Sequence, residues 1–99
     1  MPQITVGADA GKTSHVAAAA DPAGDRVLGH LRFPVGRPGF ERFCAFVRRA
    51  AGGTGEAETV LVGMEASGHY HLTLAEFLAA RGYAVVLVNP YRAAQFRRA

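Results

Sequence analysis

The first third of the chain carries short apolar runs separated by turn-forming residues, and this pattern predicts three β-strands. Residues 4–9, ITVGAD, form a mostly apolar run that ends in the glycine-containing turn DAGKTS. Residues 15–20, HVAAAA, are ambiguous because alanine favours helix. Only six residues separate this turn from the next breaker, DPAGD, so a strand that returns antiparallel is favoured. Residues 26–33, RVLGHLRF, then complete a three-stranded meander.

A helical periodicity follows. Over residues 38–51, apolar side chains recur at i, i+3, i+4 and i+7, namely Phe40, Phe43, Cys44 and Val47. Pro38 suits the first turn of such a helix, and Gly52-Gly53 ends it. Its arginines, Arg42, Arg48 and Arg49, are then expected to be exposed. The sequence therefore predicts an amphipathic helix packed on the meander.

The second half alternates between apolar runs and helical stretches. Residues 59–65 and 84–88 predict buried strands, residues 70–81 predict a helix that ends at Gly82, and Asn89-Pro90 opens a third helical stretch. The element order βββαβαβα predicts one mixed α/β sheet. Antiparallel strands come first, and parallel strands joined by helical crossovers follow.

Two of the predicted strands end in the same pattern, Val-Gly-x-acid. Residues 6–9 read VGAD and residues 62–65 read VGME. Alternation along a strand places each acid on the same face as the glycine two residues before it. If the strands are neighbours, about 4.8 Å apart, Asp9 and Glu65 project from one rim of the sheet. Two adjacent carboxylates repel unless a cation lies between them, and Mg²⁺ prefers such oxygen ligands. The alternative is that each acid only forms a turn or caps a helix.

Composition narrows the class of protein. Ninety-nine residues, 49% of them hydrophobic, make one globular domain. A net charge of +3 and a pI near 9.6 favour a nucleic-acid or phosphate partner. The single cysteine, Cys44, excludes an internal disulfide. No signal sequence or membrane-length apolar run is visible, so we expect a soluble cytoplasmic protein without membrane contact.

Three blocks of the chain carry a family resemblance: GADAGKTSHVAAAADPAGDRV, FPVGRPGFERF and VLVGMEASGHYHLTLAEFLAARGYAVVLVNP. They resemble the N-terminal RuvC-like domain of the DEDD insertion-sequence transposases, a group described as bridge-RNA-guided recombinases that includes pilin-gene invertase relatives. The resemblance implies an RNase H-like fold and DNA strand cleavage and transfer. It also implies that Asp9 and Glu65 are the first two acids of a four-carboxylate, magnesium-binding site. DNA, and a guide RNA, are the implied partners.

The resemblance also implies site residues that residues 1–99 do not include. In this family the third and fourth acids form an Asp-x-x-Asp pair beyond the helix after Asn-Pro, and the catalytic serine lies in a further domain. Residues 1–99 are therefore expected to form a single RNase H-like domain that is truncated before the second pair of acids. We expect this fragment to be inactive alone and to self-associate as a homo-oligomer through uncovered apolar surface.

Two other functions stay open. One is a non-catalytic remnant that binds nucleic acid or dimerises. The other is an actin-like ATP-binding half-domain, in which Gly11, Lys12 and Thr13 would face phosphates. A true P-loop is disfavoured, because Gly7 and Gly11 enclose three residues and that motif needs four.

The remaining polar residues give weaker indications. Lys12, Arg92, Arg97 and Arg98 are candidate nucleic-acid contacts. His15 and His30 are predicted to be strand-face residues rather than metal ligands. Of His69 and His71, one is expected at the surface and the other as a polar contact at the start of a helix. Their spacing does not suit zinc.

Overall fold

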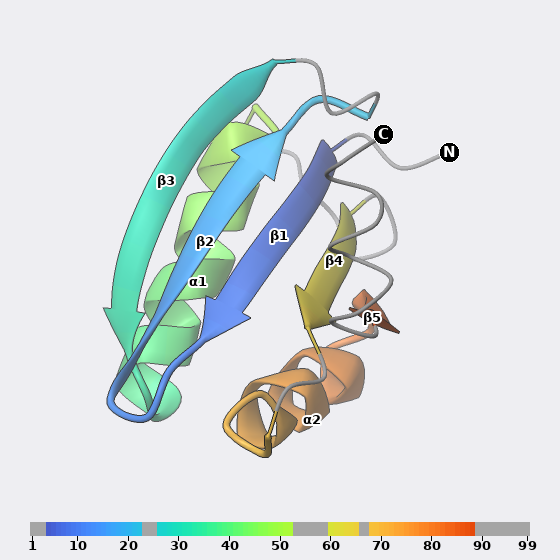
Figure 1. Cartoon of the computed structure of the whole chain (residues 1–99). Coiled ribbons are helices and arrows are strands. Elements are labelled where there is room, and N and C mark those ends of the chain that lie inside the picture. Colours follow the sequence, from blue (N-terminus) through green and yellow to red (C-terminus); the bar gives the residue numbers. More distant parts are fainter. Residues whose placement is uncertain (1–3, 23–25, 53–59, 66–67, 89–99) are drawn as a thin grey trace.

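A computed structural model of the chain describes residues 4–22, 26–52, 60–65 and 68–88. Figure 1 shows strands side by side in one twisted sheet with helices packed against it. The elements are β1 (Ile4–Ala10), β2 (Ser14–Ala20), β3 (Val27–Pro34), α1 (Arg37–Ala50), β4 (Val60–Glu65), α2 (Leu72–Ala80) and β5 (Ala84–Val88). All the predicted strands and the first two helices are thus confirmed to within a few residues. The helical stretch predicted after Asn89 lies outside the described residues.

The sheet is mixed, with the strand order β3-β2-β1-β4-β5. β1 pairs antiparallel with β2, and β2 pairs antiparallel with β3. β1 pairs parallel with β4, and β4 pairs parallel with β5. This arrangement confirms the α/β class and is compatible with the RNase H-like fold, with the N-terminal strand at the centre of the sheet (Figure 1).

The hydrophobic core lies on one face of this sheet, where alternate strand residues meet the helices. On β1, for example, Ile4, Val6 and Ala8 are buried, whereas the alternate residues Gly7 and Asp9 are exposed. The same alternation continues on β2, β3 and β4. The inward side chains and the helix residues that cover them are Ile4, Val6, Ala8, Ala17, Ala19, Phe33, Phe40, Phe43, Cys44, Phe46, Val47, Ala51, Val60, Val62, Met64, Leu74 and Leu78.

Helix α1 packs as its periodicity predicted. Phe40, Phe43, Cys44 and Val47 are buried, and the predicted arginines are exposed. Gly39 lets the first turn approach β3 closely, because a Cβ at this position would lie 1.9 Å from the carbonyl oxygen of Pro34. The helix ends at Ala50, and Gly52, two residues further on, has a φ of +79° that is readily adopted only by glycine.

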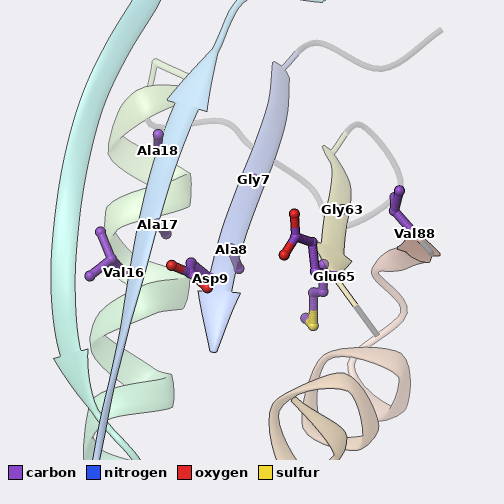
Figure 2. Close-up of a pocket in the computed structure, with 10 residues that line it drawn as sticks. Gly7, Ala8, Asp9, Val16, Ala17, Ala18, Gly63, Glu65 and Val88 are labelled. Atoms are coloured by element: carbon purple, nitrogen blue, oxygen red, sulfur yellow. The ribbon is translucent and has the colours of Figure 1, made fainter. Parts of the chain in front are cut away.

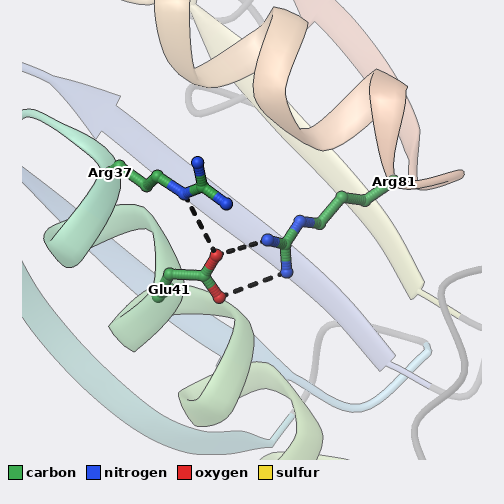
Figure 3. A network of polar contacts seen from close by, with 3 residues as sticks. All are labelled: Arg37, Glu41 and Arg81. Carbon is green, nitrogen blue, oxygen red and sulfur yellow. Dashed lines mark hydrogen bonds and ion pairs between the residues drawn. The ribbon is translucent and has the colours of Figure 1, made fainter.

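A polar network joins the two helices on the same side of the sheet (Figure 3). The Arg81 guanidinium, just after α2, donates two hydrogen bonds to the Glu41 carboxylate of α1, one of them at 3.2 Å. Arg37 lies one helical turn before Glu41, with Nε 3.9 Å from Oε1. The Arg81 guanidinium also lies 4.5 Å from the centre of the Phe77 ring. Because these ionic groups are partly exposed, they orient the helices more than they stabilise the fold.

The free cysteine is a packing residue. Cys44 is buried, and burial raises the pKa of its thiol. Burial, and then the neighbouring Cys44, raise the pKa of Tyr83 to about 12. A protonated thiol in the core is a poor nucleophile, so Cys44 carries no chemistry here.

The strands predicted to be fully buried are covered less than expected. On β4, Leu61, Gly63 and Glu65 are only half-buried. On β5, Val86 and Leu87 are 46% and 48% exposed. The prediction was wrong for a physical reason: in the described residues, helices cover one face of the sheet, and β5 is its edge strand. Neither described helix is long and apolar enough to cross a membrane.

Candidate metal centre

Two acids lie near the carboxyl ends of the strands β1 and β4. The parallel ladder pairs Gly7 with Gly63 and Ala8 with Met64. One further step along both strands brings Asp9 level with Glu65. Asp9 is in turn paired with Val16 of β2, and Glu65 with Val88 of β5. The structure therefore confirms that the repeated Val-Gly-x-acid pattern lies in register on neighbouring parallel strands.

Both acids belong to the sheet face that the helices leave uncovered. Their strand neighbours Ala8 and Met64 point into the core, with 7% and 1% exposure, so the acids point the other way. Figure 2 shows both carboxylates beside the carboxyl-terminal half of β1. They are thus held by rigid strands rather than by a loop.

A hollow of about 520 Å³ lies over this part of the sheet. Its lining consists of Gly7, Ala8, Asp9, Val16, Ala17, Ala18, Gly63, Met64, Glu65 and Val88 (Figure 2). Apart from the two acids, these residues offer no side-chain charge. The hollow therefore has a small, apolar floor and an anionic rim.

The glycines of the floor are not required by the backbone. Neither Gly7 nor Gly63 has a positive φ. A Cβ on Gly7 would meet no atom within 4 Å, and one on Gly63 would meet only the Val6 carbonyl oxygen at 3.9 Å. A glycine inside a strand costs stability relative to alanine. What these two glycines provide is open space directly beside the carboxylates.

The donor set suits a hard cation but is incomplete. Carboxylate oxygens are the ligands that Mg²⁺ prefers, and Mg²⁺ keeps several waters when few protein ligands are present. Within the described ranges, no group of three or more His, Cys, Asp or Glu side chains could hold a metal ion. By ligand type, Asp9 and Glu65 suit a partly hydrated Mg²⁺, for which water would fill most positions.

Of the four basic residues predicted to contact nucleic acid, the structure describes only Lys12. Lys12 is exposed in the turn between β1 and β2, at the same end of the sheet as Asp9. Arg92, Arg97 and Arg98 lie outside the described residues. His30 and His69 are exposed.

Two buried histidines are the features that sequence reasoning missed. His15 is on a strand, as predicted, but faces the helices with 0% exposure, and His71 starts α2 with 4% exposure. His71 makes no side-chain cap hydrogen bond, which corrects the predicted polar contact. The available signal was alternation, since His15 shares its strand face with the buried Ala17 and Ala19.

The neutral form of His15 is favoured. Burial lowers the pKa of its imidazole below the ordinary 6.5, while the charge of Asp9 acts in the opposite direction. A neutral ring is able to accept a hydrogen bond at Nδ1, and Gly11 donates its backbone N–H to that atom at 3.1 Å.

Comparison with known proteins gives the family of the chain. A family-wide sequence model of the IS110-type DEDD transposases, described as transposase, matches residues 6–99. The chain belongs to this family. The search of curated proteins found no match.

Among solved structures, the fold is similar to that of a putative N-acetylglucosamine kinase from Chromobacterium violaceum. The TM-score is 0.58 at 16% sequence identity, over 89% of this chain and 35% of the kinase. This chain therefore spans about a third of the kinase's length. At this identity the likeness concerns the fold alone.

Proposed function

We propose that Asp9 and Glu65 are two ligands of a Mg²⁺ site in the N-terminal catalytic portion of a transposase or recombinase that cleaves and joins DNA strands. The observation that carries this proposal is the β1–β4 register, which aligns two acids over an open hollow. Membership of a transposase family supplies the context for reading that pair as a catalytic site.

The roles of the residues follow from their chemistry. The two carboxylates hold the ion and are not nucleophiles. When bound, Mg²⁺ polarises a phosphate and stabilises negative charge on the attacking and leaving oxygens. Gly7 and Gly63 leave room for the nucleic-acid backbone beside that ion. Lys12 would contact a phosphate at the same end of the sheet, and Arg92, Arg97 and Arg98 are further candidates.

The metal site is tested by Mn²⁺ titration, which detects binding through paramagnetic broadening of nearby backbone amides. Asp9→Asn and Glu65→Gln each remove an anionic ligand without changing side-chain size, so both should weaken Mn²⁺ binding. Glu76→Gln is the matched control, because Glu76 is exposed on α2. Equal Mn²⁺ binding by the Glu65→Gln and Glu76→Gln variants would refute the site.

We further propose that this chain alone does not cleave DNA. Two carboxylates leave most ligand positions to water, so Mg²⁺ should bind no tighter than about millimolar, roughly −4 kcal/mol. Supercoiled plasmid incubated with the chain and Mg²⁺ should therefore stay intact. Cleavage that disappears in Asp9→Ala would show instead that two acids suffice.

A second candidate, an ATP-binding half-domain, is favoured by the fold likeness to a sugar kinase and by the Gly11-Lys12-Thr13 turn. ATP would then raise the melting temperature of the wild type but not of Lys12→Ala. A non-catalytic module would bind DNA, a guide RNA or a second copy of the chain equally well with Asp9 intact or replaced.

A further inference from the structure

The turn after Asp9 is held from beneath by a buried histidine. Gly11 lies two residues beyond Asp9 and donates its N–H to Nδ1 of His15 at 3.1 Å. The turn is tight at this point, because a Cβ on Gly11 would lie 2.5 Å from the Ser14 carbonyl oxygen. Val35 adds a second restraint by donating its N–H to the Thr13 carbonyl at 3.1 Å.

The His15 ring is anchored in the aromatic part of the core. Its centroid lies 5.3 Å from that of Phe33 in an edge contact and 6.0 Å from that of Phe40 in a stacked contact. Both phenylalanines are themselves buried, at 0% and 5% exposure. The ring therefore has little freedom, and the hydrogen bond it makes is fixed in direction.

An imidazole is a costly side chain at this position. Because Nδ1 accepts the Gly11 N–H, the proton of the neutral ring is assigned to Nε2. In the described part of the chain, Nε2 is buried and has no hydrogen-bond partner. A buried polar atom without a partner destabilises a protein. A phenyl ring would give similar aromatic packing without this cost, so the imidazole is explained by its bond to Gly11.

We infer that His15 is a positioning residue for Asp9, acting through the backbone of Gly11. His15 is also the backbone partner of Ala10 in the ladder, and Val16 is the partner of Asp9. The bond to Gly11 therefore extends the β1–β2 pairing past Asp9 and fixes the chain on both sides of that carboxylate. The inference rests on the proposed metal site, since metal ligands bind well only when their surroundings hold them in place.

Two substitutions separate the hydrogen bond from the packing. His15→Asn keeps an acceptor, Oδ1, close to the position of Nδ1 but loses the ring. His15→Phe keeps the ring but loses the acceptor. For each variant, Mn²⁺ affinity, thermal stability and hydrogen exchange of the Gly11 amide are measured on the full chain.

The two variants should rank in one order for stability and in the opposite order for Mn²⁺ affinity. His15→Phe should fold as stably as wild type but bind Mn²⁺ about ten- to a hundredfold more weakly, the usual effect of losing an outer-shell partner. Its Gly11 amide should exchange faster. His15→Asn should be less stable yet retain Mn²⁺ affinity and Gly11 protection. Mn²⁺ affinity that simply follows stability would overturn the inference.

Failure of the proposed metal site gives a different result from failure of the inference about His15. If wild-type protein does not bind Mn²⁺, or Asp9→Asn binds it equally well, the proposed function falls, whatever the His15 variants do. If a variant does not fold, the imidazole ¹⁵N spectrum of wild type decides instead. A neutral ring protonated at Nε2 supports the inference, and protonation at Nδ1 overturns it.

Discussion

The two faces of the sheet are formed by the same strands, but one face is packed and the other is open. The helix-covered face is filled with large apolar side chains such as Phe33 and Met64, both almost fully buried. On the open face, the neighbouring strands carry Gly7, Gly63 and Ala18 side by side, and the two acids follow at the edge of the hollow. Residues next to one another in sequence thus serve packing and open space alternately.

This difference separates the residues that stabilise the fold from those that leave the open face accessible. On the covered face the buried apolar side chains form one continuous core, and the buried ring of His15 on β2 is linked to the turn behind Asp9. On the open face, glycines occupy positions where the backbone would tolerate a side chain. The comparison can be tested by substitutions that are chemically alike but fall on opposite faces.

The largest effect is expected at the centre of the covered face. Phe43 is 0% exposed and its ring centre lies 5.2 Å from that of Phe33. Phe43→Ala should lower the free energy of unfolding by about 3–5 kcal/mol, the usual range for a buried aromatic. Chemical denaturation measures this, with exposed Arg42→Ala as control. A loss below roughly 1 kcal/mol would show that the helix face had been misassigned.

A smaller but still clear loss is expected where α1 meets β3. A Cβ on Gly39 would overlap the Pro34 carbonyl group, which is backbone and cannot rotate away. Gly39→Ala should therefore destabilise the protein by about 1–3 kcal/mol, as overpacking does. Thermal or urea unfolding checks this value. A variant as stable as wild type would mean that α1 does not approach β3 so closely.

The buried histidine predicts a pH dependence that belongs to the covered face. Since burial lowers the folded-state pKa of His15, the unfolded chain binds a proton more readily than the folded one. The contribution of neutral His15 to the free energy of unfolding is complete above the pKa of the unfolded state, about 6.5. It is lost as the pH falls from that value towards the lower pKa of the folded state. The loss should not exceed about 1.4 kcal/mol per pH unit.

Stability measured from pH 7.5 to 5 should therefore fall more steeply in wild type than in His15→Phe, which has no group to titrate at this position. Parallel curves for the two proteins would show that other groups control the acid dependence.

Much of the fold and the core of the site could be predicted from sequence because the relevant signals are local. Alternation in residues 4–9 predicted both the strand and its two faces. The i, i+3, i+4, i+7 pattern did the same for α1. The matched Val-Gly-x-acid endings predicted that Asp9 and Glu65 would share a rim, which the register of β1 with β4 confirms.

What could not be predicted depends on contacts between distant segments. A purely apolar run such as residues 84–88 does not reveal whether the strand is central or at an edge. The Arg81–Glu41 contact joins residues 40 apart in sequence. The role of His15 required knowing which strand face the helices cover and that Phe40 would lie on its ring.

The smallest effect on stability, and the most informative one, is expected at Gly7. No atom lies within 4 Å of a Cβ built there, and its φ suits any residue. Gly7→Val should leave the free energy of unfolding unchanged or raise it by about 0.5–1 kcal/mol, because glycine is unfavourable inside a strand.

The valine side chain of Gly7→Val would fill part of the hollow and should weaken binding of a short DNA strand in the presence of Mg²⁺. Ala20→Val is the matched control, since Ala20 is half-buried on the same face but does not line the hollow. Thermal unfolding and fluorescence anisotropy of labelled DNA measure the two effects. A marked loss of stability in Gly7→Val would mean that the chain itself packs into this hollow, and the contrast between the two faces would then be wrong.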